Sequence, residues 1–308
     1  MKILVTGGAG FIASHVVDAY IEGGHDVLVI DDFSTGQRRN LNPRAKVEAL
    51  DVADPAAAER LRAFKPDVVN HHAAQMDVRR SVADPMFDAR VNIIGFINLL
   101  EAAKATGVKK VIFASSGGAI YGDQEPIPAD EEHSTLPSSP YGVSKLAGEL
   151  YLGYYHTVFG LPYIALRYAN VYGPRQSSKG EAGVVAIFID HLLAGNRPVI
   201  NGDGKQTRDY VYVGDVVAAN TIALESAYVG PVNIGTGVET DVLTICLLLT
   251  EELGSKLEPI HGPAKAGEQR RSCLDTGLAR RVFGWTPRTA LREGLGQTVA
   301  YYRDTGRV

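Results

Sequence analysis

A tyrosine and a lysine spaced four residues apart are the side chains best suited to chemistry. Tyr141 and Lys145 lie in SSPYGVSK (138–145), directly after Pro140. Residues at positions i and i+4 share one face of a helix, and proline is favoured in its first turn. A phenol has a reference pKa of about 10, so it acts as a base near neutral pH only when positive charge stabilises the phenolate. We expect Lys145 to supply part of that charge.

A glycine-rich turn near the N-terminus is the second chemical feature. The expected strand 2–6 runs into Gly8-Ala9-Gly10-Phe11-Ile12-Ala13 (8–13), a G-x-G-x-x-A pattern before a helical segment. Such a turn brings backbone N–H groups and a helix N-terminus close to a pyrophosphate. Asp31 ends the second expected strand, where a carboxylate accepts hydrogen bonds from a ribose and repels a 2′-phosphate. The pattern favours NAD over NADP, although Arg38 and Arg39 are near enough in sequence to hold a phosphate.

The elements that must position these residues follow an alternating order. Continuous apolar runs indicate strands at 2–6, 26–31, 46–50, 67–73, 109–116 and 162–170, and helical patterns lie near 10–23, 54–63, 84–106 and 140–159. Continuous rather than alternating apolar strands are typical of a parallel sheet covered on both faces. The order predicts an α/β fold, a Rossmann-like doubly wound parallel sheet.

The pattern changes after residue 170. The segment 170–183 is rich in Gly, Pro and Ser and is typical of a long functional loop. We therefore expect a smaller C-terminal substrate-binding lobe. The predicted division assigns residues 1–168 to an NAD-binding domain, to which 209–237 return, and residues 169–208 and 238–308 mainly to the lobe.

Composition limits the class of protein. The chain has 308 residues, 45% of them apolar, and a formal net charge of −4 without a polybasic run, which disfavours a nucleic-acid partner. Its two cysteines, Cys246 and Cys273, have no metal-ligand spacing and imply no disulfide framework, which suits a reducing cytoplasm. We expect neither a signal peptide nor a membrane helix, because no apolar run reaches about 18 residues.

The full set of motifs resembles the extended short-chain dehydrogenase/reductase superfamily, and more closely the UDP-glucose 4-epimerase (UDP-galactose 4-epimerase) family. The resemblance covers essentially the whole chain. The segments that carry it, in family order, are VTGGAGFI, VNIIGFINLLEAA, SSGGAIYG, SPYGVSK, LRYANVYGPRQ, GEAGVVAIF, GDGKQTRDYVYVGDV and NIGTG.

The resemblance implies tightly held NAD, with Tyr141 as the base and Lys145 as its ribose-binding helper. It also implies a set of cofactor contacts from the loops that follow the strands. These are Gly7, Gly10, Phe11 and Ile12 at the pyrophosphate, Asp31 and Asp32 at the ribose, Asp51 and Val52 at the adenine, and Ala73, Ala74, Gln75, Asn92, Ser115 and Tyr168 elsewhere along the cofactor.

The hydroxyl that holds the reacting sugar oxygen lies where this chain departs from the family pattern. Ser116 is the first candidate and Ser115 the second, unless both only cap backbone groups at the strand end. In much of the family the hydroxyl residue lies four positions before the Tyr of YG, where this chain has Gly117. Either one glycine is looped out or the hydroxyl has moved.

The resemblance also implies a UDP-sugar site. Asn170 and Arg208 match positions that hold the diphosphate, and Arg grips phosphate bidentately. The remaining implied contacts are Val184, Val185 and Val199 at the uridine, Lys265 with Arg271 as its substitute at the phosphate, and Ser272 at the position that limits sugar size.

The implied reaction is 4-epimerisation of UDP-glucose and UDP-galactose through a 4-keto sugar. Gly117-Gly118 replace the Asp–Glu pair of 4,6-dehydratases, while Asn170 and Ser177 replace residues typical of glucuronate epimerases. A small Ser272 leaves UDP-N-acetylhexosamines open, and UDP-glucuronate or a non-catalytic NAD-binding regulator remain alternatives. The apolar patterns of 90–103 and 146–159 either cover the sheet or pair two subunits as a homodimer.

Overall fold

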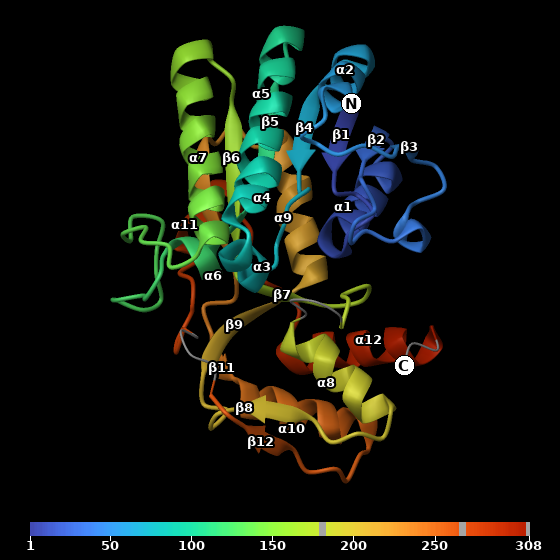
Figure 1. Cartoon of the computed structure of the whole chain (residues 1–308), viewed down its shortest axis with the longest axis vertical. Helices are drawn as coiled ribbons and strands as arrows, with labels where there is room; N and C mark the ends of the chain where they lie inside the picture. The colour runs from blue at the N-terminus through green and yellow to red at the C-terminus, as the bar shows by residue number, and fades with distance from the viewer. Residues whose placement is uncertain (179–182, 265–268, 306–308) are drawn as a thin grey trace.

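A parallel sheet forms the centre of the larger part of the molecule. The structure is a computed structural model that describes residues 1–178, 183–264 and 269–305. In that part of the chain the sheet has seven strands in the order β10-β6-β5-β4-β1-β2-β3, and all are parallel (Figure 1). The strands are β1 (Lys2–Thr6), β2 (Asp26–Ile30), β3 (Lys46–Glu48), β4 (Val68–His71), β5 (Lys110–Ser116), β6 (Tyr163–Tyr168) and β10 (Gly230–Ile234).

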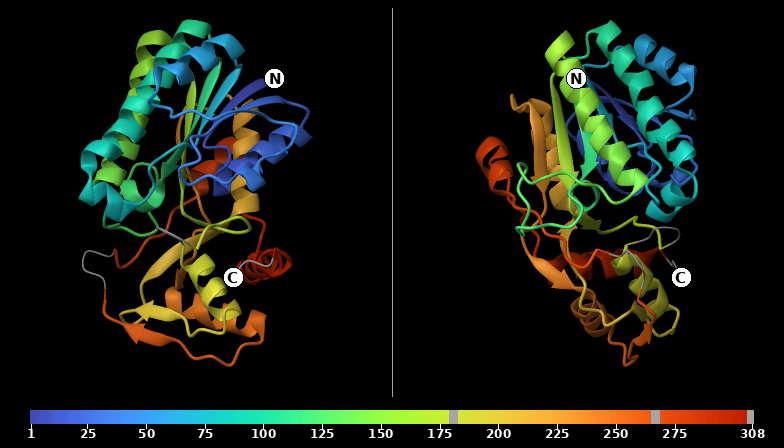
Figure 2. Two further views of the ribbon diagram at one scale, coloured as in Figure 1. Left: turned by 45° about the vertical axis from the view of Figure 1, so that its right-hand side comes forward. Right: turned by 60° about the vertical axis from the view of Figure 1, so that its left-hand side comes forward.

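Helices cover both faces of this sheet, which explains its continuous apolar strands. Ile3 and Val5 pack into one apolar cluster and Leu4 into another, because successive strand side chains point to opposite faces. The first face is covered by α1 (Phe11–Glu22), α9 (Val213–Glu225) and α11 (Gly277–Phe283), and the second by α2 (Pro55–Phe64), α5 (Gly95–Thr106) and α7 (Pro140–Phe159) (Figure 2). The predicted doubly wound sheet is confirmed.

Two of the predicted elements are divided in the structure. The run 162–170 forms β6 and then β7 (Asn170–Tyr172), and the pattern 84–106 forms α4 (Pro85–Ala89), a π-helical turn (Arg90–Ile94) and α5. Two short helices, α3 (Val78–Ala83) and α6 (Gly117–Ile120), were not expected, because six and four residues carry too little periodicity. None of the helices in the described residues is long and apolar enough to cross a membrane.

The smaller lobe lies beyond the carboxyl ends of the central strands (Figure 1). It contains the strand order β11-β9-β7 and the pair β12-β8, packed with three helices around their own apolar cluster. Its further elements are α8 (Val184–Leu193), β8 (Val199–Asn201), β9 (Thr207–Tyr212), β11 (Glu239–Asp241), α10 (Val242–Leu253), β12 (Ile260–Gly262) and α12 (Leu291–Asp304). Two segments differ from the predicted division: β9 pairs within the lobe, and α11 packs against β10 of the central sheet.

A buried ion pair fixes α7 to the sheet. Glu149 of α7 and Arg167 of β6 approach to 2.6 Å, with side chains only 7% and 6% exposed. Glu149 also accepts a hydrogen bond from Ser115 at the end of β5. Arg167 also donates to the hydroxyl of Tyr121, which donates in turn to Asn233 of β10. One helix is thereby joined to three strands through charge-assisted hydrogen bonds.

Loss of the carboxylate charge should destabilise the protein strongly. We expect Glu149→Gln to lower the free energy of unfolding by about 3–5 kcal/mol, because it leaves the Arg167 guanidinium buried without a counter-charge. Urea unfolding followed by circular dichroism measures this. The double variant Glu149→Leu/Arg167→Met removes both charges and should recover much of the loss. A single variant as stable as the wild type would contradict the importance of the pair.

Candidate active site

The candidate site lies where the carboxyl ends of the central strands meet the smaller lobe. From β1 the chain builds outward through β2 and β3, and then crosses to β4, β5 and β6 on the other side. The crevice at such a reversal is where open α/β sheets bind ligands. This edge brings together the ends of β1 to β6 and the loops that follow them, from which most of the predicted cofactor contacts come.

The turn after β1 fits a pyrophosphate. Gly7 has φ +69°, and an added Cβ would lie 2.7 Å from the backbone nitrogen of Ala73. Only glycine permits both this conformation and this approach to the loop after β4. Gly10 begins α1 without a side-chain cap, so N–H groups of the first turn, which includes Phe11 and Ile12, remain available for an anion.

Asp31 connects the end of β2 to this turn. Its buried carboxylate accepts hydrogen bonds from the backbone nitrogens of Ala9 and Phe33, at 2.9 and 2.8 Å. Burial raises the pKa of Asp31, and the two N–H donors act in the opposite direction. The neighbouring Asp32 is exposed and accepts from Ser34. Arg38 lies over the Phe33 ring at 4.0 Å, so its guanidinium is engaged beside the position where a ribose would lie.

The loops after β3 and β4 carry the next predicted cofactor contacts. Asn92 forms two hydrogen bonds with the backbone of Gln75, accepting from its nitrogen at 2.8 Å and donating to its oxygen at 2.9 Å. Asn92 lies in the π-helical turn, a feature frequent at functional sites. In the same region Ala73 and Ala74 are half-buried, Asp51 accepts from the nitrogen of Ala53, and Val52 packs beneath Gly95.

The structure brings Tyr141, Lys145 and Ser116 together. Pro140 and the N-cap Ser139 begin α7, and Tyr141 lies in its first turn. The Ser116 hydroxyl lies close enough to the Tyr141 phenol to lower its pKa. The Lys145 ammonium donates to the carbonyl of Ala114 at 2.8 Å and lies 5.8 Å from the centre of the Tyr141 ring. This is the arrangement expected of a base, its cationic helper and a hydroxyl that holds a sugar oxygen.

Side-chain contacts decide which serine faces Tyr141. Ser115 donates to Glu149 at 2.5 Å, so its hydroxyl belongs to the structural ion pair, while Ser116 contacts Tyr141. Gly117 is not looped out but begins α6, and a Cβ there would lie 2.6 Å from the Leu274 side chain. Gly117, which stands where much of the family has its hydroxyl residue, therefore does not move the hydroxyl of Ser116 away from Tyr141.

Burial governs the charges of the catalytic pair in the cofactor-free chain. Burial and, to a smaller extent, the negative charge of Asp88 raise the pKa of Tyr141 to about 12, against a lowering effect of Ser116. Burial lowers the pKa of Lys145 to about 8. In the cofactor-free chain the effect of burial dominates the phenol pKa. The expectation that Lys145 and an oxidised nicotinamide together lower this pKa concerns the complex with NAD and stays a prediction.

The predicted substrate contacts gather on the adjoining face of the lobe. Exposed Asn170 on β7 pairs in register with Tyr210 of β9, the strand that carries Arg208. The carbonyl of Thr207 accepts from both the Arg208 guanidinium and the nitrogen of Ser272, so these two residues lie together. The position of a Cβ on Gly118 lies 3.9 Å from Asn170 Oδ1, which places Asn170 next to the Ser116 segment.

Other predicted contacts differ in accessibility. Arg271 is bonded bidentately to Glu239, at 2.9 and 2.5 Å. Val185 is buried in the apolar cluster of the lobe, so its side chain is withdrawn from any ligand. Val184 at the start of α8 is half-buried, Val199 on β8 is exposed, and Ser272 is buried. Tyr168 is also buried, and its hydroxyl accepts a hydrogen bond from Asn220. Lys265 lies outside the described residues.

Three polar residues next to the catalytic pair were missed at the level of sequence. Ser144 donates to buried Asp88 at 2.6 Å, and Glu149 bonds Ser115. Spacing alone contains a signal, since Tyr141, Lys145 and Glu149 recur every four residues and Asp88 precedes Asn92 by four. Without the packing, nothing distinguished these residues from a solvated helix face.

Comparisons with known proteins agree with this geometry. The profile of the NAD dependent epimerase/dehydratase family matches residues 3–235. The UDP-glucose 4-epimerase of Mycolicibacterium smegmatis is 45% identical over 310 residues, covering 99% of both chains. The crystal structure of Thermotoga maritima UDP-glucose 4-epimerase with UDP-glucose has a TM-score of 0.98, 48% identity and full coverage of both chains. The Thermus thermophilus UDP-glucose 4-epimerase complex with NAD has a TM-score of 0.94, 43% identity and full coverage of both chains.

The two serines should respond differently to removal of their hydroxyls. We expect Ser116→Ala to lower kcat by about 10²–10³-fold, since it removes a hydrogen bond to the reacting centre, without changing the melting temperature. Ser115→Ala should instead lower the free energy of unfolding by about 1–3 kcal/mol, because a buried carboxylate oxygen loses its donor. Turnover assays and thermal melts of both variants measure this, and the reverse pattern would exchange the two roles.

Proposed function

Because the chain belongs to the NAD dependent epimerase/dehydratase family, we propose that it catalyses 4-epimerisation of a UDP-hexose, interconverting UDP-glucose and UDP-galactose. The observation that carries the proposal is the grouping of Tyr141, Ser116 and Lys145: the Ser116 hydroxyl lies next to the phenol, and the Lys145 ammonium lies 5.8 Å from the centre of its ring, at the sheet edge that holds the glycine turn. Two relatives that are 45% and 48% identical over essentially the full chain are named as UDP-glucose 4-epimerases, which supports the same reaction.

The residues of this chain have complementary tasks in the reaction. Tyr141 accepts the proton of the sugar 4-hydroxyl when C4 is oxidised, and returns it when C4 is reduced on the opposite face. Ser116 holds the reacting oxygen and transmits the proton through its hydrogen bond to the phenol. Bound NAD supplies a reversible hydride acceptor, and its positive ring adds the charge that lowers the phenol pKa. No net oxidation results.

The two lobes divide the binding work in this proposal. The central sheet, with the glycine turn and Asp31, holds NAD, and the smaller lobe holds the nucleotide sugar. Asn170 and Arg208 bind the diphosphate, so most binding energy falls on UDP and little on the hexose. A hexose held this loosely can present either face of its 4-keto form to the same cofactor.

The alternatives differ in how well these residues fit. Gly117 and Gly118 provide no carboxylate for dehydration, and Asn170 favours a neutral hexose over a hexuronate. Small Ser272 favours an additional N-acetylhexosamine activity, since its side chain occupies little of the space at the predicted sugar-size position. A purely regulatory NAD-binding protein has no need for the contact of Tyr141 with Ser116.

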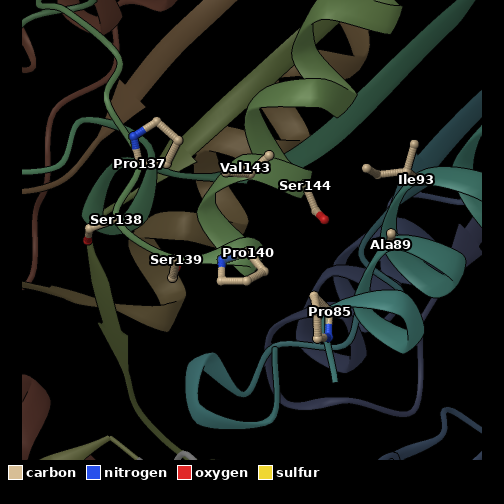
Figure 3. A pocket seen from close by; sticks show the side chains of 9 residues that line it. All are labelled: Pro85, Ala89, Ile93, Pro137, Ser138, Ser139, Pro140, Val143 and Ser144. Atoms are coloured by element: carbon tan, nitrogen blue, oxygen red, sulfur yellow. The ribbon is translucent and has the colours of Figure 1, made fainter. Parts of the chain in front are cut away.

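We also propose a homodimer built on α5 and α7. The two helices are neighbours, and apolar side chains that a monomer would leave in water are exposed along α7 and in the π-helical turn before α5. Beside them, a groove of about 460 Å³ runs between the start of α7 and the α4 segment (Figure 3). The exposed apolar residues of this face include Ile94, Val143, Leu150, Tyr154 and Val158.

Turnover without added cofactor tests the proposed activity. Incubation of the purified chain with UDP-galactose should yield UDP-glucose, detected by chromatography, because tightly held NAD is regenerated in each cycle. Tyr141→Phe should lower the rate by about 10²–10⁴-fold. The control Tyr154→Phe alters an exposed phenol on the same helix and should remain active. Absence of conversion by the wild type, even with NAD added, would contradict the proposal.

A charged residue introduced on the exposed surface of α7 tests the proposed dimer. We expect Leu150→Arg, at a side chain 68% exposed, to convert the protein to monomers, measured by size-exclusion chromatography with light scattering. Leu247→Arg changes a leucine that is 54% exposed on α10 and should leave the dimer intact. A monomeric wild type, or a dimeric Leu150→Arg variant, would refute this interface.

A further inference from the structure

The least accessible carboxylate near the catalytic pair has no task in the mechanism above. Asp88, at the end of α4, is 0% exposed. It accepts three side-chain hydrogen bonds, from Gln75 Nε2 at 3.1 Å, Asn92 Nδ2 at 3.0 Å and Ser144 Oγ at 2.6 Å. A carboxylate is buried in this way only when its lone pairs are satisfied, so these contacts must form together.

The three donors come from three different elements of the site. Gln75 belongs to the loop after β4 and Asn92 to the π-helical turn, and Asn92 also fixes the Gln75 backbone. Ser144 lies on α7 between Tyr141 and Lys145. Figure 3 shows its hydroxyl pointing from α7 toward the segment that carries Ala89. Asp88 is thus the common acceptor through which two cofactor loops are held against the catalytic helix.

The charge of Asp88 also reaches the catalytic pair. It raises the pKa of Tyr141 and the pKa of Lys145, while Glu149 raises that of Lys145 from the other side. On β4, the imidazoles of His71 and His72 also face Lys145, and burial lowers both of their pKa values well below 6.5, so they are neutral at neutral pH.

We propose that Asp88 is a positioning residue of the active site, which locks the Gln75 and Asn92 segments to α7 and sets the charge balance between Tyr141 and Lys145. The inference rests on the proposed epimerase function. Asp88 touches neither substrate nor cofactor in this proposal. Its negative charge keeps Lys145 protonated and holds the phenol neutral until the cofactor adds its positive charge.

The decisive variant is Asp88→Asn, which can retain every hydrogen bond. Oδ1 still accepts from Gln75 and Asn92, and the Ser144 hydroxyl can turn to accept from the new amide. Only the charge is lost, so both pKa values should fall. We expect the acidic and alkaline limbs of the kcat/KM profile for UDP-galactose to move together to lower pH, by about one unit.

Two further variants separate charge from structure. Asp84→Asn neutralises an exposed carboxylate that caps the same helix, and its profile should superimpose on that of the wild type. Ser144→Ala removes a hydrogen bond but keeps the charge, so its limbs should stay in place even if the rate falls. A lower rate in Asp88→Asn with unmoved limbs would reduce Asp88 to a structural residue and overturn the proposal.

A second measurement needs no substrate and separates this inference from the function itself. Ultraviolet titration of the NAD-loaded protein, taken as the difference from its Tyr141→Phe counterpart, follows the Tyr141 phenolate alone. The phenolate should form at lower pH in Asp88→Asn than in the wild type, even if the wild type turns over no UDP-hexose. If Asp88→Asn loses NAD or its native melting temperature, Asp88→Ser removes the same charge from a smaller side chain. Equal titrations, or failure of both variants to fold, would contradict a role in charge balance.

Discussion

The fixed position of α7 against the central sheet is the constraint on which the site depends. The helix carries Tyr141 and Lys145, and it is held by the buried pair of Glu149 with Arg167. The same carboxylate accepts the hydroxyl of Ser115, so this serine belongs to the structural ion pair, while Ser116 lies next to the phenol. The ion pair therefore joins the helix that carries Tyr141 to the end of the strand that carries both serines. Such a pair adds little net stability, and its value lies in allowing only one arrangement.

The electrostatics of the site follow from burial rather than from the proximity of the two catalytic groups. A phenol removed from water resists ionisation, and an ammonium removed from water loses its proton more readily. Both shifts belong to the cofactor-free chain, in which burial disfavours the charged form of each group.

The two lobes meet at the point where glycine allows close approach. Gly117 begins α6 directly after Ser116, and the side chain of Leu274 occupies the space that a Cβ would need. Leu274 belongs to the segment that contains Ser272, and Gln124 binds both the Cys273 nitrogen and the Ser272 hydroxyl. The chain that borders the predicted sugar position is thereby packed against Gly117, the residue next to Ser116.

The amino-acid sequence by itself determined the fold class, the alternation of strands and helices along the chain, the glycine turn and the spacing of Tyr141 and Lys145. These features are local, because periodicity, turn residues and i,i+4 spacing are set by neighbours in the chain. Only the tertiary structure decided that Ser116 rather than Ser115 meets Tyr141, that Val185 is withdrawn into the core of the lobe, and that Asp88 joins Gln75, Asn92 and Ser144. Each of these depends on contacts between residues far apart in sequence and on the loss of water around them, which no local pattern encodes.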